Sequence, residues 1–194
     1  IIWRRRWIQI TKYAAVIALL VTSSLGVYSL LNTPETQQMI TANVKSGSKS
    51  EIILPDGTKV QLNGATTITY DVNSSKQRLV QLSGEAFFDV AKNPDCPFRV
   101  IANGLQIEVV GTSFNVNTYK KGVVETSLLT GQIKISGGSL PQEYILTPGE
   151  KATYSSINNA LKITQADVHV ETGWCDDYLI FDSEPLIDVI EELE

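Results

Sequence analysis

The chain has 194 residues, 43% of them hydrophobic and 19% charged, with a formal net charge of −5 at pH 7. This length can hold one medium-sized domain with additional segments. Four of the sixteen basic residues precede the uncharged stretch described next, so twelve basic and all twenty-one acidic residues follow it, a balance of −9. An acidic balance argues against nucleic acid as a partner of that later part.

An uncharged stretch from Tyr13 to Leu31 predicts one transmembrane helix. As a helix it would cover about 28 Å, close to the thickness of the hydrocarbon core of a bilayer. Basic residues lie in segment 1–12, and none follows the stretch until Lys45, which places the N-terminus in the cytoplasm and the bulk of the chain outside. Serine and threonine at 22–24 weaken the hydrophobicity, but helical hydroxyl groups can bond back to backbone carbonyls.

Two alternatives to a transmembrane helix stay open. A cleaved signal peptide also has a basic start and an apolar run, although this run exceeds a typical apolar signal core and no clear cleavage site follows it. The second alternative is a helix buried in a globular domain. The flanks argue against it, because three arginines precede the run and a polar segment follows it.

Residues 32–48 are polar with no sustained period and are predicted to be a linker, whereas residues 49–168 predict an all-β domain. Asp56-Gly57 between two apolar runs predicts a hairpin, and Asn73-Ser74-Ser75 predicts a turn. Periodicity does not decide between a sandwich, a barrel and a twisted solenoid. The predicted strands are Ile52–Leu54, Val60–Leu62, Thr66–Val72, Arg78–Leu82, Ala86–Ala91, Phe98–Ala102, Leu105–Val110, Ser113–Tyr119, Val123–Leu129, Gln132–Ser136, Tyr144–Leu146, Lys151–Tyr154 and Leu161–Thr164.

Segment 169–194 predicts the beginning of a small α/β module. Tyr178–Phe181 is an apolar strand, and Asp182 to Pro185 supplies capping oxygens and a first-turn proline for a helix. The helix has one apolar stripe, which we expect the continuation of the module to bury. The stripe consists of Leu186, Val189, Ile190 and Leu193.

The sequence shows no convincing enzyme constellation, and no cofactor or metal is predicted. His169 is the one histidine and no nucleophile motif accompanies it, which favours a structural or surface role. Glu85 and Asp89 lie an even number of residues apart on one predicted strand and are interpreted as solvated edge charges. Cys96 and Cys175 both fall outside the predicted membrane span, where a disulfide is chemically allowed, but sequence alone does not pair them.

Gly111-Thr112 is the one position with chemical interest. A threonine hydroxyl can attack the preceding carbonyl if the backbone is strained, which gives an ester that water then opens. Glycine permits unusual torsions and leaves the approach unobstructed. The alternative, a bulge or turn between two strands, explains the same dipeptide without chemistry.

Several motifs in one order resemble the FecR-type anti-sigma regulators. They are Leu54–Leu62 (LPDGTKVQL), Arg78–Val90 (RLVQLSGEAFFDV), Pro97-Phe98, Val110–Val116 (VGTSFNV), Leu146–Glu150 (LTPGE), and Trp174 followed by Phe181 and Pro185-Leu186.

The resemblance implies a fold and a set of partners. It implies a cytoplasmic helical domain, expected before Ile1, that holds an extracytoplasmic-function sigma factor. It also implies one inner-membrane helix, a twisted solenoid-like periplasmic β-domain, and an STN-like module that meets the signalling domain of a TonB-dependent outer-membrane transducer. Some members cleave themselves at the Gly-Thr of a G-T-x-F-x-V motif, which Gly111, Thr112, Phe114 and Val116 match here.

The expected protein is therefore mainly β, with a cytoplasmic segment 1–12, a helix 13–31 contacting membrane lipid, a linker 32–48, a β-domain 49–168 and a truncated STN-like module 169–194. It is expected to relay a signal from the transducer to the sigma factor, with self-cleavage and intramembrane proteolysis as further steps, and not to be a turnover enzyme. The alternatives are a structural β-rich envelope protein and an autoproteolytic or hydrolytic enzyme. Expected partner contacts are Trp174, Phe181, Leu186, Val189, Ile190 and Leu193.

Overall fold

The structure is a computed structural model that describes residues 17–29, 38–72 and 78–176. The chain divides into one unit over Ile1–Thr36 and a second over Gln37–Glu194, and each is described by itself. The predicted turn at residues 73–75, the strand at 178–181 and the helix that follows it lie outside the described residues.

In the first unit residues 17–29 are helical. As predicted, hydroxyl groups bond back to the helix: Thr22 Oγ1 donates to Ala18 O at 2.9 Å, and Ser23 Oγ donates to Leu20 O at 3.0 Å. These bonds satisfy polar groups that would otherwise project from the helix. Within the described ranges, no helix has both the length and the apolar character needed to span a membrane.

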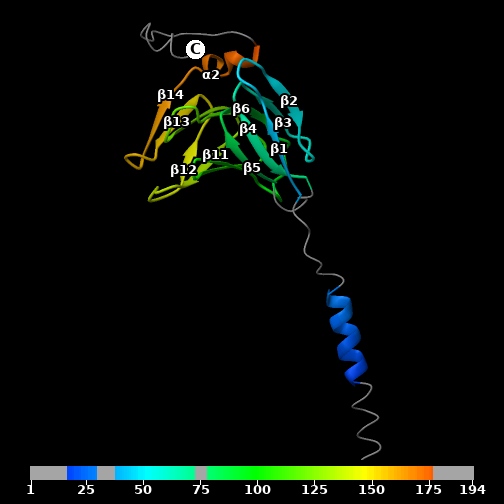
Figure 1. Cartoon of the computed structure of the whole chain (residues 1–194). Coiled ribbons are helices and arrows are strands. Elements are labelled where there is room, and N and C mark those ends of the chain that lie inside the picture. Colours follow the sequence, from blue (N-terminus) through cyan, green and yellow to red (C-terminus); the bar gives the residue numbers. More distant parts are fainter. Residues whose placement is uncertain (1–16, 30–37, 73–77, 177–194) are drawn as a thin grey trace, which may run out of the picture. The chain divides into compact units, whose positions relative to one another are not determined.

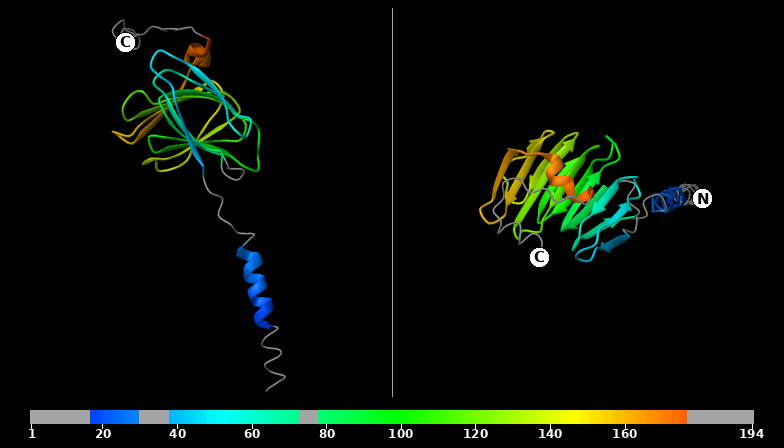
Figure 2. Two further views of the ribbon diagram at one scale, coloured as in Figure 1. Left: turned by 45° about the vertical axis from the view of Figure 1, so that its right-hand side comes forward. Right: turned by 90° about the horizontal axis from the view of Figure 1, so that it is seen from above.

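The second unit contains two seven-stranded sheets in its described part (Figures 1 and 2). In chain order the strands are β1 (Met39–Asn43), β2 (Ser50–Ile53), β3 (Lys59–Leu62), β4 (Thr67–Asp71), β5 (Arg78–Ser83), β6 (Glu85–Asp89), β7 (Phe98–Ala102), β8 (Leu105–Val109), β9 (Ser113–Asn117), β10 (Val123–Thr130), β11 (Ile133–Gly137), β12 (Tyr144–Leu146), β13 (Glu150–Ser155) and β14 (Ala160–Gln165). Two short helices follow, α2 (Val168–Thr172) and η1 (Gly173–Asp176).

Strand order shows how the chain builds both sheets at once. One sheet, called sheet A here, has the order β1-β4-β5-β7-β8-β11-β12, and the other, sheet B, has the order β14-β13-β10-β9-β6-β3-β2. In both sheets the strands follow the chain from one edge to the other, as the colour gradient in the right-hand view of Figure 2 shows. The domain is therefore a two-sheet sandwich whose chain advances along its length as a solenoid does, and it is not a closed barrel.

The core lies between the two sheets because alternate residues of most strands point inward. β5 and β8 show this alternation of buried and more exposed positions. Phe88 of sheet B is central: its ring centroid lies 5.2 Å from that of Phe114 and 6.0 Å from that of Phe98 in sheet A. All three rings are at most 1% exposed, which makes them the largest aromatic contribution to the buried core.

Gly84 marks one crossing between the sheets, from β5 to β6. Its φ is +110°, and a Cβ there would lie 2.4 Å from Thr66 Oγ1 and 2.7 Å from Thr66 Cα. Only glycine fits this backbone conformation and this close approach. The Thr66 hydroxyl in turn accepts from Glu85 N at 3.0 Å. Because Gly84 has no side chain, the first residue of β6 can pack directly against the loop that precedes β4.

The predicted strands and the hairpin at Asp56-Gly57 are confirmed, with Ile53 paired to Lys59 across the hairpin turn. The linker predicted over 32–48 is wrong over Met39–Asn43, because β1 pairs antiparallel with β4 there. β1 is an edge strand whose side chains are mostly exposed, so the apolar alternation that identifies a strand is absent. Backbone pairing with β4 holds β1 in place, together with hydrogen bonds from Thr67 Oγ1 to Asn43 Oδ1 at 2.7 Å and between the Thr41 and Thr69 hydroxyls at 3.0 Å.

Candidate functional site

The Gly111-Thr112 turn joins β8 of sheet A to β9 of sheet B. Thr112 is only 3% exposed, and its Oγ1 donates a hydrogen bond to Gln132 O at 3.2 Å. The Thr112 carbonyl accepts from Val90 N at 3.0 Å. These bonds fix the hydroxyl and the carbonyl of the threonine against the residues that follow β6 and precede β11.

Two glycines are required by the packing of this turn. A Cβ on Gly111 would lie 2.8 Å from Lys92 Cα, and a Cβ on Gly131 would lie 2.7 Å from Thr112 Oγ1 and 3.0 Å from Gly111 O. Any larger residue at either position would therefore have to move backbone or the threonine hydroxyl. Gly131 packs directly against the Gly111 carbonyl and the Thr112 hydroxyl. This glycine was not singled out from the sequence.

The rest of the G-T-x-F-x-V motif has a packing role in β9. Phe114 and Val116 point into the core and are fully buried, whereas Ser113 and Asn117 lie on the outer face. The motif therefore places a buried hydroxyl next to a glycine carbonyl at the point where a core strand begins. This is the order of groups that an N-to-O acyl shift needs.

A surface cleft of about 310 Å³ opens beside the turn, and Gly111, Thr112 and Gln132 are among the residues that line it. Its wall is charged: Glu108 pairs with Lys134 at 2.8 Å and with Arg99 at 2.8 Å. The hydrogen bond from Lys134, followed by that from Arg99, holds the pKa of Glu108 below its ordinary value. The cleft can bring water to the turn, but no hydrogen bond among the described residues joins Thr112 Oγ1 to an ionisable side chain.

A second cluster, the carboxylate-amide cluster, lies on the outer face of sheet B and consists of Glu85, Asn63, Asn115 and Asn117. Asn63 Nδ2 donates to Glu85 Oε2 at 2.8 Å, while Asn115 Nδ2 and Asn117 Nδ2 donate to Oε1 at 2.9 and 3.1 Å. Three amides thus share one carboxylate that is only 7% exposed. A buried carboxylate needs such donors because leaving water is costly for a charge.

The prediction that Glu85 is a solvated edge charge is therefore wrong. The donors that satisfy it come from β9 and from the end of β3, which are distant in sequence. Asn115 and Asn117 alternate with Phe114 and Val116 along β9, and that alternation was a sequence signal for a polar strip on one face. Asp89, on the same face of β6, is exposed as predicted.

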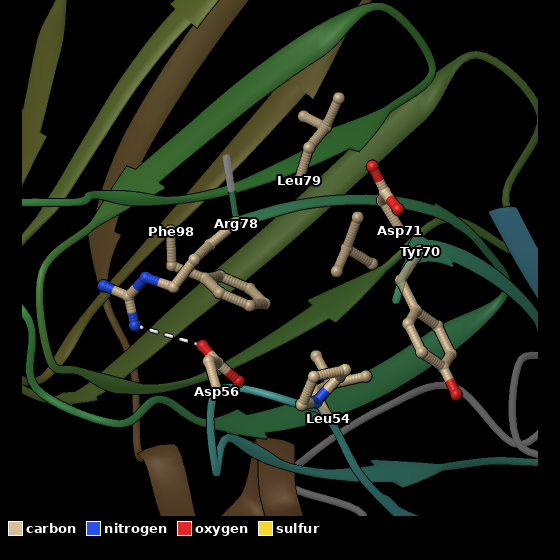
Figure 3. Close-up of a pocket in the computed structure, with 9 residues that line it drawn as sticks. Leu54, Asp56, Tyr70, Asp71, Arg78, Leu79 and Phe98 are labelled. Carbon is tan, nitrogen blue, oxygen red and sulfur yellow. Dashed lines mark hydrogen bonds and ion pairs between the residues drawn. The ribbon is translucent and has the colours of Figure 1, made fainter. Parts of the chain in front are cut away.

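Arg78 forms a third buried polar group, shown in Figure 3 with Asp56 and Phe98. Its Nη1 lies 3.1 Å from Asp56 Oδ2, and its guanidinium lies 5.7 Å from the centroid of the Phe98 ring. It also donates to three backbone carbonyls, those of Cys96, Ala91 and Asn93. Arg78 therefore fastens the loop between β6 and β7 to the hairpin turn before β3, and its full set of partners indicates a structural role.

Of the expected partner contacts, only Trp174 falls among the described residues. It lies in η1 and is only 8% exposed, so a partner could reach its ring only after this segment moves. Phe181, Leu186, Val189, Ile190 and Leu193 lie outside the described residues.

Cys96 and Cys175 are free thiols, and the backbone N of His169 donates to the capping Asp167 Oδ1 at 3.0 Å. In the described ranges no group of three or more histidine, cysteine or acidic side chains is arranged to hold a metal ion.

The family model described as FecR protein matches residues 40–134. Two crystal structures of a proposed anti-sigma factor from Parabacteroides distasonis ATCC 8503, at 2.50 and 1.65 Å resolution, are 31% identical to this chain with a TM-score of 0.73 each. The alignments cover 81% and 80% of this chain and 74% and 73% of those chains. Among curated proteins, none matches the sequence.

Proposed function

This chain belongs to the FecR protein family, and from that premise we propose that it is an anti-sigma regulator that relays an external signal to an extracytoplasmic-function sigma factor. The observation that carries the proposal is the agreement of sequence and fold with the Parabacteroides protein, a proposed anti-sigma factor. The sigma factor would be held by a domain preceding Ile1, and the signal would come from the signalling domain of a TonB-dependent outer-membrane transducer.

The proposed location is the inner membrane, with one crossing over Tyr13–Leu31, the N-terminus in the cytoplasm and the β-domain in the periplasm. Support comes from the segregation of charge along the sequence and from the apolar surface of helix 17–29, where Leu19 is 70% and Leu25 61% exposed. A contiguous apolar surface on a helix marks a site of membrane or protein contact. Residues 13–16 and 30–31 of the proposed span lie outside the described residues.

Self-cleavage between Gly111 and Thr112 is proposed as a maturation step. In this step Thr112 Oγ1 bonds to the Gly111 carbonyl carbon, the C–N bond breaks to leave a free Thr112 amine, and water then hydrolyses the ester to restore the hydroxyl. The motif, the close glycine packing and the adjacent cleft support the proposal. Expressing the chain beside its Thr112→Ala variant tests it on a gel, and an uncleaved parent chain would remove it.

Intramembrane proteolysis is proposed as the step that frees the cytoplasmic part. The polar run at 22–24 and Gly26 would favour local opening of the helix. A Cβ on Gly26 meets no atom within 4 Å, so replacing residues 22, 23, 24 and 26 by leucine stiffens the helix without a steric clash. We expect signal-dependent release to be lost in that variant, and unchanged release would contradict this step.

Transcription tests the relay as a whole. Cells that lack the gene should no longer couple the external signal to transcription from the promoters of the sigma factor, and the intact gene should restore the coupling. A normal signal response in the deletion strain would contradict the proposed relay.

A further inference from the structure

Segment 168–176, formed by α2 and η1, lies over the outer face of sheet B and contacts β10 (Figure 2, right). Ala166 N donates to Gly149 O at 2.9 Å, which fixes the chain just before the segment begins. Beyond that point two lysines of the β-domain hold the segment. Lys151 Nζ lies 2.9 and 3.0 Å from the two carboxylate oxygens of Glu171, and Lys49 Nζ donates to Trp174 O.

The contact between this segment and the sheet is incompletely satisfied. Trp174 Nε1, a donor, and Asn115 Oδ1, an acceptor, are both buried and have no hydrogen-bond partner among residues 17–29, 38–72 and 78–176. The other polar atom of the Asn115 amide, Nδ2, does have partners. It donates to Glu85 Oε1 within the sheet at 2.9 Å, and to Glu171 O of the segment at the longer distance of 3.4 Å. A buried unpaired polar group regains hydrogen bonds when it returns to water. Each such group raises the equilibrium constant for undocking of the segment by a factor of about five or more.

The sheet does not depend on the segment to satisfy its own charges. Glu85 keeps three amide donors from Asn63, Asn115 and Asn117 whether or not the segment is present. Lys151 likewise has a second carboxylate partner in the sheet, Glu125 at 3.1 Å. Undocking would therefore leave no charge of the sheet buried without a partner, which removes the largest cost of exposing this face.

The segment is also too short to be stable alone. It has one five-residue α-helix and one 3-10 turn, with Val168, Gly173 and Trp174 as its buried residues. Isolated helices of this length do not form in water, so the docked structure depends on contacts with the sheet.

From these observations we propose that residues 168–176 act as a releasable clasp on the outer face of sheet B. The clasp opens locally while the sandwich stays folded, and opening exposes Trp174, Cys175 and the carboxylate-amide cluster. Because the clasp links β14 to residues 177–194, any protein that binds or pulls on those residues would act on its equilibrium.

Cys175 supplies a native reporter of clasp opening. Its thiol is partly covered in the closed clasp, and burial, assisted by the charge of Glu85, raises its pKa to about 12. Such a thiol is protonated and unreactive at pH 8, whereas an exposed thiol reacts readily because more of it is thiolate. Replacing Cys96 by serine leaves Cys175 as the one thiol of the chain.

The test measures the alkylation rate of Cys175 by iodoacetamide at pH 8 in the Cys96→Ser chain. Glu171→Gln weakens the link to Lys151 and should raise the rate about fivefold. Val168→Ala removes part of a buried apolar side chain that anchors the segment, and should raise the rate about fivefold or more. Glu143→Gln, a change at an exposed ion pair of Lys134, serves as the control and should leave the rate unchanged.

Urea separates local opening from global unfolding. A local opening exposes little surface, so the alkylation rate should stay nearly constant at low urea before the unfolding transition begins. A rate that rises from the lowest urea concentrations with the slope of global unfolding would overturn the proposal. So would equal rates in the parent, Glu171→Gln and Val168→Ala chains.

Discussion

Replacing Arg78 by methionine tests whether one buried guanidinium holds the loop between β6 and β7. Arg78 has a 4% exposed side chain and donates to Cys96 O at 2.7 Å, Ala91 O at 2.7 Å and Asn93 O at 3.2 Å, besides its pair with Asp56. Methionine preserves much of the packing but leaves these acceptors without their charged donor. Breaking a buried ion pair typically costs about 3–5 kcal/mol, and water entering beside the exposed loop recovers part of this, so we expect a loss of about 4 kcal/mol.

Urea and thermal unfolding followed by far-ultraviolet circular dichroism measure this loss. About 4 kcal/mol corresponds to a fall in Tm of about 10 °C for a domain of this size. Arg99→Met is the matched control, because Arg99 is 44% exposed and its partner Glu108 keeps Lys134; it should cost less than about 1 kcal/mol. If the two variants lost equal stability, Arg78 would not be the anchor that its contacts indicate.

Three further predictions concern glycine packing, acid stability and the threonine hydroxyl. Gly84→Ala should lower the free energy of unfolding in urea by about 2 kcal/mol or more, because the new Cβ meets the Thr66 backbone. Gly47→Ala, also at positive φ but in open space, should lower it by about 1 kcal/mol. Equal losses in the two variants would contradict the packing argument. Because the folded-state pKa of Glu108 is depressed, its contribution to stability is present above its ordinary pKa of 4.5 and is lost as pH falls through the lower folded value; Glu108→Gln should therefore flatten the acid side of the stability profile, and an unchanged profile would contradict this assignment. Thr112→Ser should keep self-cleavage and Thr112→Val should abolish it on a gel, while cleavage of the valine variant would exclude the hydroxyl as nucleophile.

Local patterns predicted most of the strands because their signals are local. β8, for example, alternates buried Leu105, Ile107 and Val109 with more exposed residues, which is the period of a strand with one face in a core. β1 was not predicted, because an edge strand with exposed side chains needs no such alternation. The order of strands in the two sheets was also beyond reach, because pairing between distant segments depends on the whole chain.

The candidate site was predictable only in part for the same reason. The Gly111-Thr112 pair could be singled out from its residue types, but its dependence on Gly131 comes from the turn between β10 and β11, about twenty residues later. Glu85 was misassigned because a charged residue on a strand usually faces water, and the amides that shelter it belong to other strands. Contacts of this kind appear only when the sheets are assembled.

The most direct test of the central claim is affinity capture of the intact protein from its native cells, followed by identification of the bound proteins by mass spectrometry. The proposed relay predicts that an extracytoplasmic-function sigma factor and a TonB-dependent transducer are both recovered. Capture from cells that express the protein without residue 38 and all that follow it should retain the sigma factor and lose the transducer. Recovery of neither protein with the intact chain would contradict the account.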